Sequence, residues 1–202
     1  MGGHSVIGVT GNIACGKSTV DAMLLQLGAG MVIDADRVVH ALLSEDAAIQ
    51  QAVVDRFGPM VRGDAGIDRP ALGTIVFADP EALRDLEVIL HPAVRQRIVA
   101  TIAGLPQGGS AVIDAVKLVQ GPLSALCASR WWVTATPEQQ LERLITTRGL
   151  SRAEALQRIA AGPRLDQWRA AVDVVIDNSG PLTSTREQVR QAWLAAQGRP
   201  AG

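Results

Sequence analysis

The sequence predicts an α/β fold in which helices flank a parallel β-sheet. Three observations lead to this prediction. Short apolar runs alternate with amphipathic stretches along most of the chain, and a glycine-rich loop joins the first apolar run to the first amphipathic stretch. The chain has 202 residues, of which 48% are apolar and 19% are charged, so it can bury a sizeable core.

The N-terminal part of the chain has the pattern of a β-α-β unit. An apolar run over residues 5–9 leads into the glycine-rich loop. An amphipathic stretch over residues 20–27 follows, and Gly28 is expected to end it as a C-cap. A second apolar run covers residues 31–33. Because a helix connects the two runs, the strands are expected to be parallel.

Later parts of the chain supply the remaining strands and helices. Three further apolar runs are expected to be strands, which gives five in all: residues 111–113, 131–134 and 172–176. Thr136 and Ser151 each precede a Gln or Glu by three residues, so each is expected to begin a helix as its N-cap. Residues 183–196 are expected to form a closing amphipathic helix.

Residues from about 47 to 105 differ from the rest of the chain. They carry helical patterns separated by Gly, Pro and Asp, and no run in them predicts a strand. Residues 58–69 are the most loop-like piece. We expect a helical excursion from the sheet, and not a separate domain.

Charge and cysteine content exclude several classes of protein. The net charge is −1, with 19 basic and 20 acidic residues, so no nucleic-acid partner is expected. No apolar run reaches the roughly 18 residues of a membrane span, and no membrane partner is expected. Two cysteines cannot build a disulfide framework, which favours a reducing, cytoplasmic location.

Residues 11–18, GNIACGKS, match the phosphate-loop pattern G-x-x-x-x-G-K-S/T in full. Glycines let backbone N–H groups turn toward phosphate oxygens, and the N-terminus of the following helix favours the same anion. Lys17 would contact the β and γ phosphates of ATP, and the Ser18 hydroxyl would ligate Mg²⁺. The expected nucleotide contacts are Gly11, Asn12, Ile13, Ala14, Cys15, Gly16, Lys17, Ser18 and Thr19. Cys15 is interpreted as a small packing residue and not as a nucleophile.

Carboxylates follow the second and third predicted strands. Asp34 and Asp36 come at the carboxyl end of the run 31–33, where open α/β sheets bind ligands. Such a carboxylate can accept the proton of an attacking hydroxyl or help to hold Mg²⁺. The alternative is that one of them caps the next helix. Asp114 also ends a strand and is a further candidate for supporting the metal.

Arginines are frequent between residues 142 and 171, where a helical lid could bring cations over a transferring phosphate and exclude water. These arginines are Arg143, Arg148, Arg152, Arg158, Arg164 and Arg169. The alternative is that most are solvated or paired with neighbouring carboxylates. We select Arg148 as catalytic because it ends a helix just before Gly149. Pro92 is expected to begin a helix with His91 near its N-cap, in a structural or a ligand-binding role.

Between residues 6 and 193 the chain resembles the dephospho-coenzyme A kinase family, which are P-loop kinases of the nucleoside-monophosphate-kinase type. The motifs that carry the resemblance lie at residues 8–19, 33–37, 76–80, 90–92 and 175–180. The resemblance implies transfer of the γ-phosphate of ATP to the ribose 3′-hydroxyl of dephospho-CoA, the last step of coenzyme A biosynthesis. It also implies a cytoplasmic transferase that is a monomer or a weak homo-oligomer.

The same resemblance implies an organisation of the whole chain and roles for single residues. A single P-loop kinase domain, 1–202, would have its five-stranded core in 1–46, 106–136 and 172–202. A helical substrate region would span about 47–105, and a lid about 137–171. Asp36 would be the general base, acting with Lys17 and Arg148, and Asn178 and Gly180 would lie near the adenine. The expected substrate contacts are Asp36, Arg37, His91 and Pro92.

Several positions depart from the family pattern. The family commonly has Gly where this chain has Asn12 and Ala14, and we expect Ala14 to adopt a negative φ. A carboxylate is usual where this chain has Gln120, and a glutamine where it has Gly162.

Three alternatives remain at this point. One is another small-molecule P-loop kinase, with a nucleoside, nucleotide or shikimate-like acceptor. The second is a nucleotide-dependent switch, although the guanine-reading sequence Asn-Lys-x-Asp is absent. The third is a degenerate kinase that binds ATP without turnover.

Overall fold

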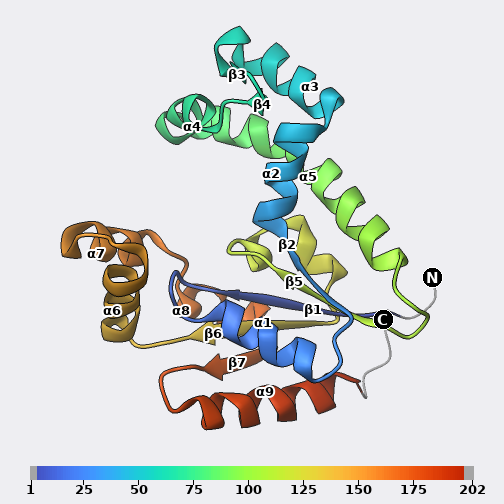
Figure 1. The fold of residues 1–202 in the computed structure, drawn as a ribbon, viewed down its shortest axis with the longest axis vertical. Helices are drawn as coiled ribbons and strands as arrows, with labels where there is room; N and C mark the ends of the chain where they lie inside the picture. Colours follow the sequence, from blue (N-terminus) through green and yellow to red (C-terminus); the bar gives the residue numbers. More distant parts are fainter. Residues whose placement is uncertain (1–3, 198–202) are drawn as a thin grey trace. The chain divides into compact units, whose positions relative to one another are not determined.

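The computed structural model describes residues 4–197, so the outermost residues of the predicted core, 1–3 and 198–202, lie outside it (Figure 1). The chain forms two compact units. The first contains the chain up to Ile33 and from Leu105 onward, and the second is Asp34–Gly104.

The first unit is built on a five-stranded sheet with the order β2-β5-β1-β6-β7. Its strands are β1 (Ser5–Gly11), β2 (Met31–Asp34), β5 (Ser110–Asp114), β6 (Ser129–Thr134) and β7 (Val174–Asp177). Pairing is parallel between β1 and β5, β1 and β6, and β6 and β7. The predicted five-stranded parallel sheet is therefore confirmed, with β1 at its centre.

Apolar residues bury the central strand on both faces, as parallel sheets require. Ile7 and Val9 face a core that α1 (Lys17–Gln26) and α9 (Leu182–Gln197) also line. These two helices lie side by side along the sheet (Figure 1). On the opposite face, Gly8 approaches Leu118 so closely that a Cβ would lie 2.3 Å from its side chain.

The remaining helices of this unit begin where the sequence predicts. Thr136 and Ser151 form complete capping boxes at the starts of α6 (Pro137–Arg148) and α7 (Arg152–Ala161). Gly149 ends α6 in the left-handed conformation, with φ 63°. Four short helical segments complete the unit: η2 (Leu118–Gln120), η3 (Pro122–Leu126), α8 (Leu165–Trp168) and η4 (Arg169–Ala171). None of the helices within residues 4–197 has the length and apolar content needed to cross a bilayer.

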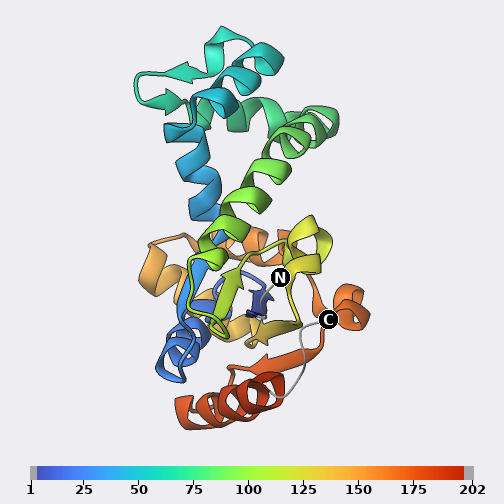
Figure 2. The ribbon, with the colours of Figure 1, turned by 90° about the vertical axis from the view of Figure 1, so that its right-hand side faces the viewer.

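The second unit is helical and has its own apolar core. Its helices are α2 (Ala35–Glu45), α3 (Ala47–Phe57), η1 (Pro59–Val61), α4 (Arg69–Ala78) and α5 (Pro80–Ala103). Helices α2 and α5 pack against each other (Figure 2). The expectation that this region has no strand is wrong, because β3 (Arg62–Gly63) and β4 (Gly66–Ile67) form a small antiparallel hairpin. Two-residue strands are too short to produce an alternating pattern.

The prediction that a helix begins at Pro92 is also wrong. Helix α5 runs without interruption from Pro80 to Ala103, so Pro92 and the exposed His91 lie in its interior. A proline inside a helix costs about 3 kcal/mol. Apolar residues on both sides of Pro92 offset this cost by continuing one buried stripe into the core: Ala82, Leu86, Leu90, Val94, Ile98 and Ile102.

Candidate active site

The loop between β1 and α1 has a backbone that only glycine can adopt at two positions. Gly11 and Gly16 have φ values of 152° and 95°. A Cβ on Gly11 would lie 2.3 Å from the carbonyl oxygen of Val133, and one on Gly16 would lie 2.1 Å from Nδ2 of Asn178. The two glycines of the phosphate-loop pattern therefore provide both the turn and the close packing of the loop.

Ala14 adopts φ 56°, so the expectation of a negative φ is wrong. A non-glycine residue in this left-handed region costs about 1 to 2 kcal/mol. One contact to this residue comes from α6, where Arg143 Nη1 donates to the carbonyl oxygen of Ala14 at 3.0 Å. Local strain of this kind persists where the surrounding structure fixes the backbone.

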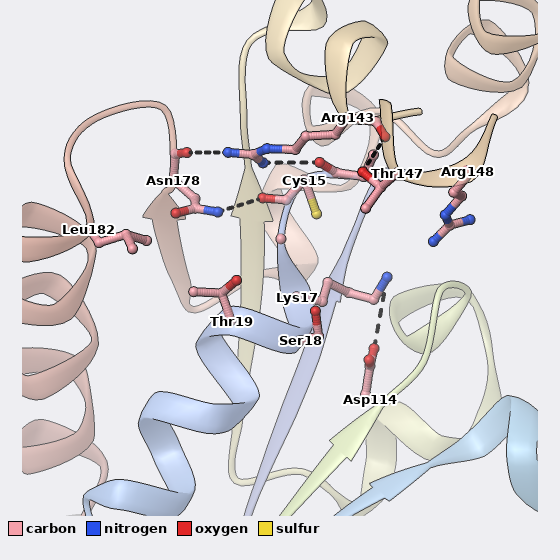
Figure 3. Close-up of a pocket in the computed structure, with 12 residues that line it drawn as sticks. Cys15, Lys17, Ser18, Thr19, Asp114, Arg143, Thr147, Arg148, Asn178 and Leu182 are labelled. Atoms are coloured by element: carbon pink, nitrogen blue, oxygen red, sulfur yellow. Dashed lines mark hydrogen bonds and ion pairs between the residues drawn. The ribbon is translucent and has the colours of Figure 1, made fainter. Parts of the chain in front are cut away.

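Lys17 lies at the N-terminus of α1, which is the positive end of the helix dipole. Lys17 is the first residue of α1, and Gly16 has no side chain to cap the helix. The Nζ of Lys17 lies 3.9 Å from Oδ1 of Asp114, the last residue of β5 (Figure 3). The register of the sheet explains why Lys17 and Asp114 lie close together. Asp114 pairs with Val9, which comes shortly before the loop. This arrangement suits an anion next to Lys17.

A pocket of about 410 Å³ opens over the loop and the start of α1. Figure 3 shows the residues around it, which come from the loop, the first turn of α1, α6, the end of β5, the segment after β7 and the start of α9. The lining residues are Ala14, Cys15, Gly16, Lys17, Ser18, Thr19, Asp114, Arg143, Thr147, Arg148, Asn178 and Leu182. Three cations against one carboxylate make the pocket a site for an anionic ligand.

Arg143 and Arg148 both line the pocket, whereas the sequence analysis selected only Arg148. Arg143 lies between Gln140 and Leu144, the buried residues of α6, and this position on the helix could have identified it. Its Nη2 also donates to the carbonyl oxygen of Asn178, at 3.4 Å.

Other arginines of the segment make contacts elsewhere. Arg164 pairs with Asp166 at 2.6 Å, and Arg169 donates to the carbonyl oxygen of Val172. Arg164 therefore fits the alternative of arginines paired with carboxylates, whereas the partner of Arg169 is a backbone carbonyl. Arg152 and Arg158 on α7 are exposed.

Cys15 is almost fully buried in the core beneath the loop. Burial raises the pKa of its thiol above the ordinary value, although the nearby Lys17 acts in the opposite direction. A thiol that stays protonated is a poor nucleophile, which fits the interpretation of Cys15 as a packing residue.

Asn178 joins the C-terminal part of the sheet to the loop. It follows β7, lines the pocket, and donates from Nδ2 to the carbonyl oxygen of Cys15 at 2.9 Å. Gly180 lies two residues further on and is not among the described residues that line the pocket. Leu182, the first residue of α9, is 60% exposed there and was not singled out from the sequence.

The remaining predicted residues belong to the second unit. Asp34 caps α2 by accepting from the backbone N–H of Arg37 at 3.1 Å, as the structural alternative for this pair predicts. Asp36 and Arg37 are exposed in the first turn of α2, and His91 and Pro92 are exposed on α5. Their roles toward a ligand at the loop stay predictions.

A metal ion at this site would need oxygen atoms from the bound anion in addition to those of the protein. Within residues 4–197 no group of three His, Cys, Asp or Glu side chains is arranged to hold a metal ion. Ser18 and Asp114 nevertheless supply oxygen atoms beside the loop. Mg²⁺ usually takes one or two protein oxygens and completes its shell with phosphate and water, so these residues fit that ion.

Comparison with known proteins gives matches over nearly the whole chain. The family model for dephospho-CoA kinase matches residues 5–184. The chain is similar to the dephospho-CoA kinase of Symbiobacterium thermophilum, with 45% identity over 200 residues that cover 98% of this chain and 83% of the relative.

Solved structures agree with the sequence match. The crystal structure of TT1252 from Thermus thermophilus is similar with a TM-score of 0.81 and 31% identity, covering 95% of this chain and 97% of that one. The dephospho-CoA kinase from Campylobacter jejuni has a TM-score of 0.59 and 24% identity, covering 96% of this chain and 97% of that one. This second likeness bears on the fold alone and identifies it as that of P-loop kinases.

Proposed function

The chain belongs to the dephospho-CoA kinase family, and from this premise we propose that it transfers the γ-phosphate of ATP to the ribose 3′-hydroxyl of dephospho-CoA. One observation carries the proposal. The cation-lined pocket lies directly over a glycine-dependent loop and the N-terminus of α1, an arrangement that suits a polyphosphate.

The first-unit residues divide the work of stabilising charge. Lys17 contacts the β and γ phosphates, and Arg148 approaches the transferring group from the end of α6. Ser18 would hold Mg²⁺ together with phosphate oxygens, and Asp114 orients Lys17. Mg²⁺, when bound, would neutralise part of the negative charge on the phosphates. Residues 137–171 act as the lid and limit the access of water.

The second unit supplies the acceptor contacts in this proposal. Asp36 accepts the proton of the 3′-hydroxyl as general base, and Arg37, His91 and Pro92 bind dephospho-CoA. The support is the resemblance of residues 33–37 and 90–92 to the family motifs, together with the position of Asp36 just after the carboxyl end of β2. Asn178 and Gly180 are proposed to lie near the adenine of ATP.

The decisive experiment is ADP formation from Mg·ATP with and without dephospho-CoA, with the Lys17→Ala variant as the blank. We expect acceptor-dependent ADP formation that the variant lacks. No dependence on dephospho-CoA would overturn the substrate assignment. Stimulation by a nucleoside, a nucleotide or shikimate instead would favour the alternative kinase. Tight ATP binding without any turnover would indicate a degenerate kinase.

We further propose a cytoplasmic enzyme that is a monomer or a weak homo-oligomer. The two cysteines are both free, which fits a reducing compartment. Light scattering coupled to size exclusion at several concentrations measures the oligomeric state. A stable large assembly at the lowest concentration would contradict this part of the proposal.

A further inference from the structure

Three consecutive carbonyl groups of the phosphate loop are held by side chains from other elements. Each accepts one hydrogen bond from a residue distant in sequence. The pairs are Gln140 Nε2 to Ile13 O at 3.0 Å, Arg143 Nη1 to Ala14 O at 3.0 Å, and Asn178 Nδ2 to Cys15 O at 2.9 Å. Two donors belong to α6 and one to the segment after β7. Figure 3 shows two of them, Arg143 and Asn178.

A fixed carbonyl also fixes the N–H group of the same peptide. The peptide unit is planar and trans, so its C=O and N–H groups point in opposite directions. A carbonyl held by a side chain on one side of the loop therefore turns the next N–H toward the opposite side. The N–H of Cys15 donates to the carbonyl oxygen of Asn12 at 3.4 Å, so the N–H groups of Ala14 and Gly16, which follow the carbonyls of Ile13 and Cys15, are the ones left to bind phosphate oxygens.

One of the three donors is itself oriented by a second buried residue. Thr185 on α9 is fully buried and donates from Oγ1 to Oδ1 of Asn178 at 3.0 Å. Because Oδ1 of Asn178 accepts this bond, its Nδ2 is the group that faces the carbonyl of Cys15. The amide packs directly on the loop, so closely that a Cβ on Gly16 would lie 2.1 Å from Nδ2.

Gln140 and Thr185 are not among the described residues that line the pocket. Both are buried, at 5% and 0% exposure, and each contacts the loop or the residue that holds it. We propose that Gln140 and Thr185 are positioning residues for phosphate binding, acting through the peptides of Ile13 and Cys15. The proposal rests on the proposed function, in which this loop binds the phosphates of ATP.

The experiment removes each donor while keeping the size of the side chain. The test variants are Thr185→Val and Gln140→Met, and Thr185→Ser retains the hydroxyl. Matched controls carry the same changes at exposed sites outside the lid, Thr183→Val on α9 and Gln26→Met on α1. For each protein the KM for ATP, the KM for dephospho-CoA, inhibition by inorganic tripolyphosphate and urea unfolding are measured.

We expect the KM for ATP to rise about three- to tenfold in Thr185→Val and Gln140→Met, the effect of one lost hydrogen bond. The inhibition constant of tripolyphosphate should rise by a similar factor, because the loop binds phosphates. The KM for dephospho-CoA should stay unchanged. Thr185→Ser and both exposed controls should match the parent enzyme.

Two results would overturn the proposal. One is reduced stability of the test variants with an unchanged KM for ATP, which indicates a structural role only. The other is a raised KM for ATP with unchanged tripolyphosphate inhibition, which places the defect at the adenosine. If Thr185→Val does not fold, Gln140→Met decides alone. Failure of the proposed function is distinguishable, because the parent enzyme itself would then lack the activity that Lys17→Ala abolishes.

Discussion

Single residues of α2 bear on the chemical step. Asp36 lies in the first turn of α2, while Asp34 is engaged as the N-cap of that helix. We expect Asp36→Asn to lower kcat at least about 10²-fold, because loss of a general base has this effect. The coupled ADP assay measures it. Asp46→Asn, at the N-cap of α3, is the control, since Asn caps a helix as well as Asp. Near-normal turnover in Asp36→Asn would contradict the assignment.

The two thiols give a prediction about pH. Burial raises the pKa of Cys127 to about 12 and also raises that of Cys15. A raised folded pKa stabilises the protein below the unfolded value of about 8.5, and this contribution is lost as the pH rises toward the folded value. We therefore expect the free energy of unfolding to fall between roughly pH 9 and pH 12.

Thiolate absorbance near 240 nm checks this directly, because the chain contains no tyrosine to obscure it. The folded protein should show little thiolate at pH 9, whereas the chain unfolded in urea should show roughly three quarters of its thiols ionised. Equal ionisation of the folded and unfolded chains would show that the thiols are not protected.

Residue identities in the phosphate loop were predictable, but their surroundings were not. Gly16, Lys17 and Ser18 form a fixed spacing whose chemistry any such loop requires. The carbonyl of Ala14, whose φ is positive, accepts from Arg143, which lies more than a hundred residues away. Local sequence carries no signal for a contact of that kind.

At the scale of elements, the C-terminal end of α7 and the residue after it contact the phosphate loop at Asn12. Asn12 Nδ2 donates to the carbonyl oxygen of Ile159 at 3.1 Å. A Cβ on Gly162 would lie 1.8 Å from Oδ1 of Asn12. Gly162 has φ −73°, so its backbone would otherwise accept alanine.

We expect Gly162→Ala to displace the Asn12 amide and to cost about 1 kcal/mol of stability, the worth of the lost hydrogen bond. In an Asn12→Gly background the same change should cost much less. Urea unfolding of both single variants and the double variant measures the coupling. Equal costs of Gly162→Ala in the two backgrounds would show that the pair is not coupled.

Helix α5 carries a proline in its interior and another at its start. Pro92→Ala should raise the free energy of unfolding by about 1 to 3 kcal/mol, because the interior proline removes a backbone donor and crowds the preceding turn. Pro80→Ala is the matched control and should bring no gain, since proline is well suited to the first turn. Chemical denaturation measures both. Equal free energies of unfolding for Pro92→Ala and the parent would show that the interior proline does not destabilise this helix.

Element boundaries followed from the sequence where capping residues mark them. Thr136 and Ser151 have side chains that satisfy helix N–H groups, so the starts of α6 and α7 were visible. Pro92 was misleading, because the buried stripe of α5 that carries the helix through it is a tertiary effect. The hairpin of β3 and β4 was missed because its turn and strands are too short to show a period.

At the scale of the whole molecule, ligand binding should stabilise the folded chain. A nucleotide at about 100 times its Kd adds about 2.7 kcal/mol to the free energy of unfolding. We therefore expect Mg·ATP to raise the Tm of the parent protein and to have little effect on Lys17→Ala. A thermal scan at several ATP concentrations measures this. An equal shift in both proteins would place the nucleotide away from Lys17.

The fold class was predictable because strand and helix periods alternate clearly along the chain. The limits of the two compact units were less visible. The first boundary falls between Ile33 and Asp34 at the end of β2, and no change of composition marks it. Such a boundary depends on how many contacts the residues make within each unit. A single sequence gives no direct information about those contacts.

The contact of Asn178 with the loop also has a consequence for synthesis of the chain. Its side chain and the carbonyl of Cys15 are 163 residues apart in sequence. The phosphate loop therefore leaves the ribosome well before the residue that holds the Cys15 peptide. Domains emerge from the ribosome N-terminus first, so an unfinished chain carries the loop without its support. The hydrogen bond that fixes the Cys15 peptide can form only after Asn178 has emerged.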